Sequence, residues 1–253
     1  MSVEPYSALA AGYDQVMEHV DYDAWAAYVH TLLRRYADAP TRIVELGGGT
    51  GSLALRLQPM GDYDYVLTDG SEAMLNRARE KIAATDVSIR CQEASFTTVT
   101  RESLHLDGAA DAVVLVYDGL NYLLEPSAVA TLFRRVHDLL RPGGVAVIDQ
   151  STPSNSEDRE EDFADEAAVD GFAYVRENQY DPETRRHETT FELLVDGQSV
   201  TERHVQRAYT MAEVQALLDD SPLTVEAAYE GVTTAPAHAD SPRIHWVLRR
   251  PFD

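Results

Sequence analysis

The stretch Arg42-Ile43-Val44-Glu45-Leu46-Gly47-Gly48-Gly49-Thr50-Gly51 decides the fold that we expect for this chain. Its first five residues are mostly apolar and predict a short buried strand, which the glycines end. Glycine lets backbone N–H groups approach a ligand closely, and the helix expected from Leu53 to Pro59 points its N-terminal end toward the same place. This order of strand, turn and helix predicts the nucleotide-binding unit of an α/β fold.

Further apolar runs predict the rest of the sheet. They lie at 63–68, 87–91, 111–116, 145–149, 225–232 and 244–249. The run at 111–116 is almost continuously apolar, as expected where both faces of a parallel sheet are covered by helices. Strands that alternate with helices at this spacing predict a doubly wound sheet, which here has seven strands.

The two ends of the chain flank that sheet. Helical spacing of apolar residues predicts helices at 6–20 and 23–36, and we expect residues 1–38 to form an N-terminal helical lid. After the fifth strand, at 145–149, the pattern changes to alternation at 172–179, 187–195 and 200–209, which predicts an antiparallel β insert. A capping-box sequence from Thr210 to Glu213 then opens a C-terminal helix.

The expected organisation is therefore an α/β fold, a Rossmann-like doubly wound sheet of seven strands with an insert. The core covers residues 39–152, and the antiparallel insert on the substrate side covers 153–209. Residues 210–253 supply the last helix and strands, which complete the core.

Composition limits the partners of this chain. Its 43 acidic and 21 basic side chains give a formal net charge of -22, which should repel nucleic acid and anionic membranes. Residues Met1 to Pro5 lack the features of a secretion signal, and Cys91 alone forms no intrachain disulfide, so we expect a cytoplasmic protein. Adaptation to high salt and a GC-rich genome both explain the acidic balance, and both interpretations stay open.

The glycine turn by itself fits two kinds of cofactor. Gly49-x-Gly51-x-x-Ala54, with Asp69 about 20 residues further on, also satisfies the dinucleotide fingerprint, so an oxidoreductase is one alternative. Glu45 argues against it, because a carboxylate inside the turn suits a cationic ligand better than an anionic pyrophosphate. A cofactor-binding module without catalysis is the second alternative, since intact binding motifs do not prove turnover.

Three motifs together resemble the class I S-adenosylmethionine-dependent methyltransferases. They are Glu45-x-Gly47-x-Gly49-x-Gly51, Asp69-x-Ser71-x-x-Met74-Leu75 and Leu140-x-Pro142-Gly143-Gly144. A second set is similar to a bacterial small-molecule subgroup, the aminosugar N,N-dimethyltransferases. It comprises Tyr13-Asp14, Asp118-x-x-Asn121-Tyr122 and Glu202-x-His204-x-Gln206-Arg207-x-Tyr209.

The resemblance implies S-adenosylmethionine as cofactor and assigns residues to it. Glu45 is expected near the methionine part of the cofactor, Asp69 on the ribose hydroxyls, Met74 against the adenine and Glu93 on the adenine amino group. Tyr13 and Tyr6 are expected in the lid, with Tyr13 close to the sulfonium. The remaining expected cofactor contacts are Gly47, Gly49, Gly51, Gly70, Ala94 and Tyr117.

The acceptor is expected beyond the fourth strand, at 111–116, because ligands bind past the carboxyl ends of parallel strands. Asp118, Tyr122 and His204 are the candidate catalytic residues, with His204 as the base. Methyl transfer from a sulfonium needs alignment above all, and an amine acceptor needs only to be neutral. We expect methyl transfer to a small molecule, with nitrogen favoured over oxygen, no metal, and a homodimer as one possible assembly through the insert.

Overall fold

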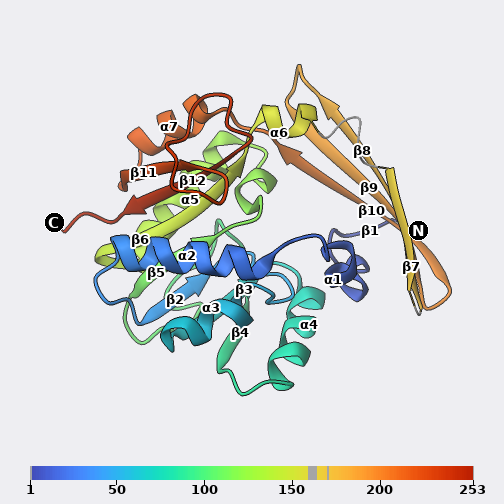
Figure 1. The fold of residues 1–253 in the computed structure, drawn as a ribbon, viewed down its shortest axis with the longest axis horizontal. Helices are drawn as coiled ribbons and strands as arrows, with labels where there is room; N and C mark the ends of the chain where they lie inside the picture. Colours follow the sequence, from blue (N-terminus) through green and yellow to red (C-terminus); the bar gives the residue numbers. More distant parts are fainter. Residues whose placement is uncertain (1, 159–163, 170, 253) are drawn as a thin grey trace.

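The computed structural model describes residues 2–158, 164–169 and 171–252, and two β-sheets organise them (Figure 1). The larger sheet has seven strands in the order β11-β12-β6-β5-β2-β3-β4. These strands are β2 (Arg42–Glu45), β3 (Asp64–Asp69), β4 (Ile89–Glu93), β5 (Ala110–Leu115), β6 (Leu140–Ser151), β11 (Thr224–Glu230) and β12 (Arg243–Arg249). β2 to β6 are parallel and β12 is antiparallel to both of its neighbours. The predicted Rossmann-like sheet of seven strands is confirmed.

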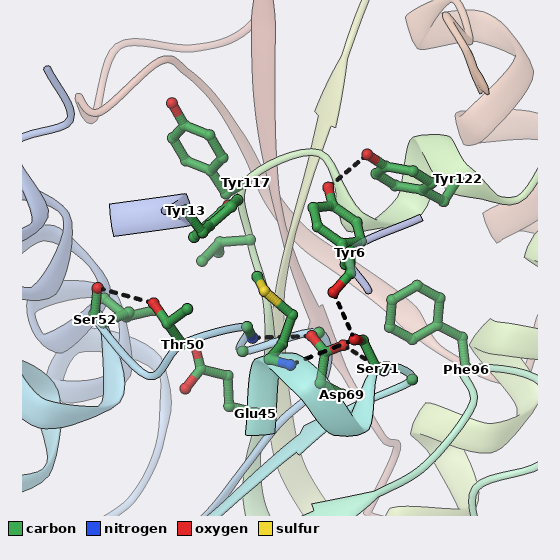
Figure 2. A pocket seen from close by; sticks show the side chains of 18 of the residues that line it. Tyr6, Tyr13, Glu45, Thr50, Ser52, Asp69, Ser71, Phe96, Tyr117 and Tyr122 are labelled. Atoms are coloured by element: carbon green, nitrogen blue, oxygen red, sulfur yellow. Dashed lines mark hydrogen bonds between the residues drawn. The ribbon is translucent and has the colours of Figure 1, made fainter. Parts of the chain in front are cut away.

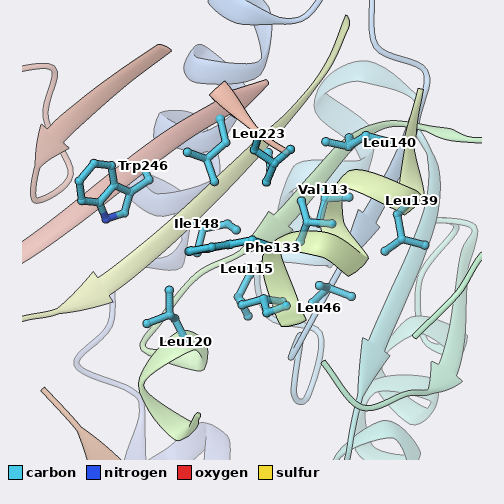
Figure 3. Close-up of a cluster of buried hydrophobic side chains, with 14 of the residues drawn as sticks. Leu46, Val113, Leu115, Leu120, Phe133, Leu139, Leu140, Ile148, Leu223 and Trp246 are labelled. Atoms are coloured by element: carbon cyan, nitrogen blue, oxygen red, sulfur yellow. The ribbon is translucent and has the colours of Figure 1, made fainter. Parts of the chain in front are cut away.

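Helices cover both faces of this sheet. One face packs against α2 (Tyr22–Tyr36), α3 (Ala54–Gly61) and α4 (Glu72–Ala83), and the other against α5 (Pro126–Leu139) and α7 (Met211–Asp219). The buried residues of β5 alternate between the two cores, with Val113 and Leu115 in the cluster that contains Phe133 and Trp246 (Figure 3). This two-sided burial explains the continuously apolar sequence of β5.

The second sheet stands beside the core and contains the insert (Figure 1). Strands β7 (Ala164–Val169), β8 (Phe172–Asp181), β9 (Arg186–Val195) and β10 (Gln198–Arg207) are antiparallel. β8, β9 and β10 lie where alternation predicted strands, whereas β7 and the preceding helix α6 (Pro153–Asp158) were not expected. The chain's own N-terminal strand, β1 (Ser2–Val3), joins the outer edge of β10 in parallel.

The prediction of a single helix at 6–20 is wrong. The structure has only a 3-10 turn at Leu9–Ala11 and the short helix α1 (Tyr13–Val16). Tyr6 has a φ of 63°, in the left-handed region, and a Cβ on Gly12 would lie 2.2 Å from the ring of Phe172. The apolar spacing is therefore used to pack a compact segment on the insert sheet and does not continue one helix.

The remaining helices follow their sequence signals. α2 occupies the second expected helix and packs on the core sheet, and Tyr22 and Trp25 at its start also line the ligand pocket described below. The capping box of α7 is present: Thr210 Oγ accepts from the N–H of Glu213, and the Glu213 carboxylate accepts from the N–H of Thr210. No helix within the described ranges has the length and apolar character needed to cross a membrane.

Candidate active site

A pocket of about 290 Å³ opens where β2, β3, β4 and β5 end (Figure 2). The segment before α2 covers it, because Pro5, Tyr6 and Tyr13 line its wall opposite the glycine turn. Most of the residues expected to bind the cofactor line this one pocket. They are Tyr13, Glu45, Gly47, Gly49, Asp69, Gly70, Met74, Ala94 and Tyr117.

The glycine turn presents its backbone to this pocket. Gly47 and Gly49 have φ values of 65° and 56°, which L side chains rarely adopt. A Cβ on Gly49 would lie 3.2 Å from Met74 Cε, and one on Gly47 would lie 3.0 Å from Phe96 Cζ. A side chain at either position would therefore press on Met74 or Phe96, which line the pocket. Gly51 does not line the pocket and instead lets the turn pack against α4.

Asp69 ties the turn to the start of α4. Its Oδ2 accepts the N–H of Gly49 at 2.9 Å, and its Oδ1 accepts the N–H of Ser71 at 2.8 Å. Burial raises the pKa of the Asp69 carboxyl, although these backbone N–H groups oppose that effect. Each oxygen keeps a second lone pair, so the carboxylate is equipped to accept two hydroxyl groups from a ligand.

Glu45 is a buried carboxyl in the wall of the same pocket. Its only polar side-chain partner among the described residues is Tyr65, whose hydroxyl donates to Oε2 at 2.9 Å. Burial raises the pKa of Glu45 to about 7, while the bond from Tyr65 lowers it. Because a nearby positive charge favours the ionised form, this carboxyl fits a ligand that carries an ammonium or sulfonium.

We therefore expect cofactor affinity to depend on pH through Glu45. In the unliganded protein the raised pKa of Glu45 contributes stability at acid pH, and this contribution is lost as the pH rises toward 7. A bound cation favours the ionised form of Glu45, which is the form present at higher pH. Affinity for S-adenosylmethionine should therefore rise about tenfold between about pH 5 and pH 8. Isothermal titration calorimetry across this range tests the prediction. In Glu45→Gln the rise should disappear, and an unchanged slope would show that another group is responsible.

A second pocket, of about 210 Å³, lies between the N-terminal segment and the insert sheet. It shares Tyr6, Tyr13, Tyr117 and Tyr122 with the first pocket, so the two are adjacent. The expected catalytic residues meet here, because Asp118 and His204 line the second pocket and Tyr122 lines both. The structure thus brings together residues that are 86 positions apart in the sequence.

Asp118 has a partner that the sequence did not reveal. Its Oδ1 lies 2.6 Å from Nη1 of Arg243, which also forms an ion pair with buried Asp149. The N–H of Asp118 donates to Asp149 Oδ1 at 3.0 Å. The network fixes the left-handed conformation of Tyr117 and Asp118, whose φ values are 69° and 67°. The charge of Asp118 is therefore matched inside the protein, which reduces its value as a contact for a substrate amine.

The expectation for Glu93 needs correction. β4 extends as far as Glu93, which pairs with Asp69, and the Glu93 side chain is exposed and does not line the pocket. The three residues that follow, Ala94 to Phe96, reach the pocket instead. Strand β4 was expected to end two residues earlier, and this error in its end point misplaced Glu93.

A polar cluster holds the N-terminal segment against the glycine turn. Asp14 pairs with Lys81 of α4, with Nζ 2.7 Å from Oδ2, and its Oδ1 accepts from the Thr50 hydroxyl at 2.5 Å. Lys81 Nζ also donates to Ser52 Oγ at 2.8 Å. The Ser71 hydroxyl donates to the carbonyl of Tyr6 at 3.0 Å. These bonds tie the covering segment to the elements that line the first pocket.

Comparisons with known proteins agree with this geometry. Residues 43–144 match the family model of a methyltransferase domain. A putative methyltransferase of Geobacillus sp. (strain WCH70) is 29% identical and aligns over 97% of this chain and 99% of its own. A solved S-adenosylmethionine-dependent methyltransferase from Clostridium acetobutylicum has a TM-score of 0.80 at 19% identity, covering 97% of this chain and 99% of that chain. The sugar N-methyltransferase KedS8 from Streptoalloteichus sp. has a TM-score of 0.69 at 19% identity, with coverages of 94% and 92%.

The fold and the pocket at the strand ends define a Rossmann-like enzyme whose site suits a nucleoside ligand with a positive charge. The family match at 43–144 includes most of the residues that line this pocket. The chain is an S-adenosylmethionine-dependent methyltransferase.

Proposed function

We propose that the enzyme transfers the methyl group of S-adenosylmethionine to the nitrogen of a small-molecule amine. The observation that carries this proposal is the second pocket, which adjoins the cofactor pocket through shared tyrosines and is enclosed by the insert. KedS8, which shares the fold over most of both chains, is a sugar N-methyltransferase, and this favours nitrogen over oxygen.

The proposed cofactor contacts follow from the pocket geometry. Glu45 faces the charged methionine part, Asp69 accepts the ribose hydroxyls, and Met74 packs against the adenine together with Phe96. Tyr13 supplies an aromatic face beside the sulfonium, where a cation is tolerated. The remaining proposed contacts are Gly47, Gly49, Gly70, Ala94 and Tyr117.

The proposed chemistry is an in-line displacement. The enclosing tyrosines exclude water and hold the acceptor nitrogen, the methyl carbon and the sulfur in one line. Tyr122 and His204 are the catalytic residues closest to the acceptor, and Asp118 acts mainly by shaping the end of β5.

Composition also bears on where the enzyme acts and on what it binds. The single Cys91 and the acidic charge support a cytoplasmic enzyme that binds neither nucleic acid nor membranes. A homodimer through the insert sheet is a further prediction, which a mass measurement in solution tests.

Binding and turnover test the function separately. Calorimetry should show binding of S-adenosylmethionine and none of NAD; the reverse result would make the enzyme an oxidoreductase. A panel of amines, aminosugars, phenols and carboxylates, screened for release of S-adenosylhomocysteine, should give turnover with amines first. Cofactor binding with no turnover on any amine would overturn the proposed acceptor and leave the cofactor assignment intact.

A further inference from the structure

A closed ring of hydrogen bonds lies beside the two pockets. Tyr6 Oη is 2.5 Å from Tyr122 Oη (Figure 2), and Tyr122 Oη is 3.1 Å from Nδ1 of His204. Nε2 of His204 is 3.2 Å from Oε2 of Glu202, which also accepts the N–H of Tyr6 at 2.8 Å. The ring joins the N-terminal segment, the 3-10 turn after β5 (Gly119–Tyr122) and strand β10.

Glu202 sets the direction of every bond in this ring. Its carboxylate is fully buried, and Oε1 also accepts the N–H groups of Ala8 and Leu9 at 2.5 and 2.8 Å. Burial acts to raise the pKa of Glu202, but the bonds from His204 and from these backbone N–H groups outweigh it and lower the pKa. An ionised carboxylate only accepts, so Nε2 of His204 must donate to it.

The donor in each of the other hydrogen bonds of the ring follows from this proton on Nε2. In the neutral form that has its proton on Nε2, the His204 ring has a lone pair on Nδ1 and accepts from the hydroxyl of Tyr122. The hydroxyl of Tyr122 is thereby used as a donor, so Tyr6 donates to Tyr122. The Tyr122 oxygen keeps one further lone pair for a ligand.

The two pockets show where that lone pair is needed. Tyr122 lines both pockets, whereas His204 lines only the second and is 3% exposed. The place where acceptor and cofactor meet is therefore reached by Tyr122, with His204 behind it. Attack on the methyl group places a developing positive charge on the acceptor nitrogen, and a base that takes one N–H proton as the N–C bond forms relieves this charge.

We propose that Tyr122 relays this proton from the methylated nitrogen to His204, and that Glu202 is the positioning residue that fixes the imidazole for the transfer. The inference rests on the proposed N-methyl transfer. The N–H bond breaks and its electron pair returns to nitrogen, while the proton joins the Tyr122 oxygen. The former Tyr122 proton moves to Nδ1 of His204, giving an imidazolium that faces the Glu202 carboxylate. The imidazolium then releases its proton to water through the second pocket.

Other charged or titratable groups surround His204 and act on the same transfer. Tyr6, Tyr122 and Glu202 are in contact with its ring, and Asp118 lies in the same pocket. Arg176 and His187 face that pocket from β8 and β9, and His19 from the N-terminal segment. Each single variant of His204 or Tyr122 keeps all of the other groups in its sequence, so a difference in pH dependence between the variants and the unchanged enzyme reports on the relay.

Kinetics on the amine that turns over fastest in the panel test the relay. Tyr122→Phe and His204→Gln should each lower kcat by about 10²- to 10⁴-fold near pH 7, which is the range for loss of a general base. The loss should shrink as the pH rises, because hydroxide replaces the missing base. Glu202→Gln should also lower kcat, but by less than either of these two variants. Arg203→Gln is the matched control: it lies on the opposite face of β10, paired with Glu188, and should keep the normal rate.

A second measurement needs no acceptor. In the nitrogen-15 spectrum of histidine-labelled protein, the signal that His204→Gln removes should come from a neutral ring with its proton on Nε2. A proton on Nδ1 instead, or kinetic losses that stay equal at every pH, would overturn the relay. Absence of turnover on every amine would overturn the proposed function, which is a different result because the spectrum is recorded without an acceptor.

Discussion

Arg243→Met should destabilise the protein by about 3–5 kcal/mol near pH 7, the range measured when one partner of a buried ion pair is removed. The Arg243 side chain is 11% exposed and pairs with both Asp118 and Asp149. Without it, two carboxylates lie side by side in the interior with no compensating cation. Its guanidinium also lies over the rings of Trp25 and Tyr117, at 5.4 and 5.3 Å, so packing around the cofactor pocket is lost as well.

Urea unfolding followed by circular dichroism measures this effect. The deficit should become smaller as the pH falls below about 6, because burial raises the pKa of Asp149 to about 6 and a protonated Asp149 needs no cation. Arg79→Met is the control, since Arg79 forms an exposed pair with Glu72 and should cost at most about 1 kcal/mol. Equal losses for the two variants would mean that the buried network does not hold the end of β5.

Asp69→Ala should weaken binding of S-adenosylmethionine by about 1–3 kcal/mol, or about 5- to 150-fold in Kd. The substitution removes the acceptor proposed for the ribose. It also frees the N–H groups of Gly49 and Ser71, so the glycine turn and the start of α4 lose their common anchor. Both effects act in the same direction.

Calorimetry with Asp64→Ala beside Asp69→Ala separates a local effect from a general one. Asp64 begins the same strand at its opposite end and pairs with Arg42, away from the pocket. Normal affinity in Asp64→Ala and reduced affinity in Asp69→Ala are expected. Normal affinity in both would mean that the carboxylate at the end of β3 does not contact the cofactor.

The cofactor half of the site was predictable from the sequence because its residues follow strand ends. Glu45 and Asp69 each close a short apolar run, and the carboxyl ends of parallel strands meet at one edge of a sheet. Knowing the strands was therefore enough to bring these side chains together. Glu93 shows the limit of this method, since an error of two residues at the end of β4 moved the wrong side chain toward the pocket.

The acceptor half depends on contacts between distant segments, and these leave no local pattern. Glu202 binds backbone N–H groups almost 200 positions away, and Arg243 reaches Asp118 from the last strand. The apolar spacing at 6–20 was real, but Leu9 and Val16 pack on an insert whose position no local rule predicts. His204 was identified as a candidate base, whereas the carboxylate that orients it became visible only in the structure.

The bond between Lys81 and Asp14 has a practical consequence, because Lys81 is the only lysine in the sequence. Reductive methylation with carbon-13 formaldehyde would label one side chain and, apart from the chain terminus, nothing else. That label would sit where α4 meets the segment covering the cofactor pocket. A single resonance would then report, during binding and turnover, how often the segment before α2 separates from α4.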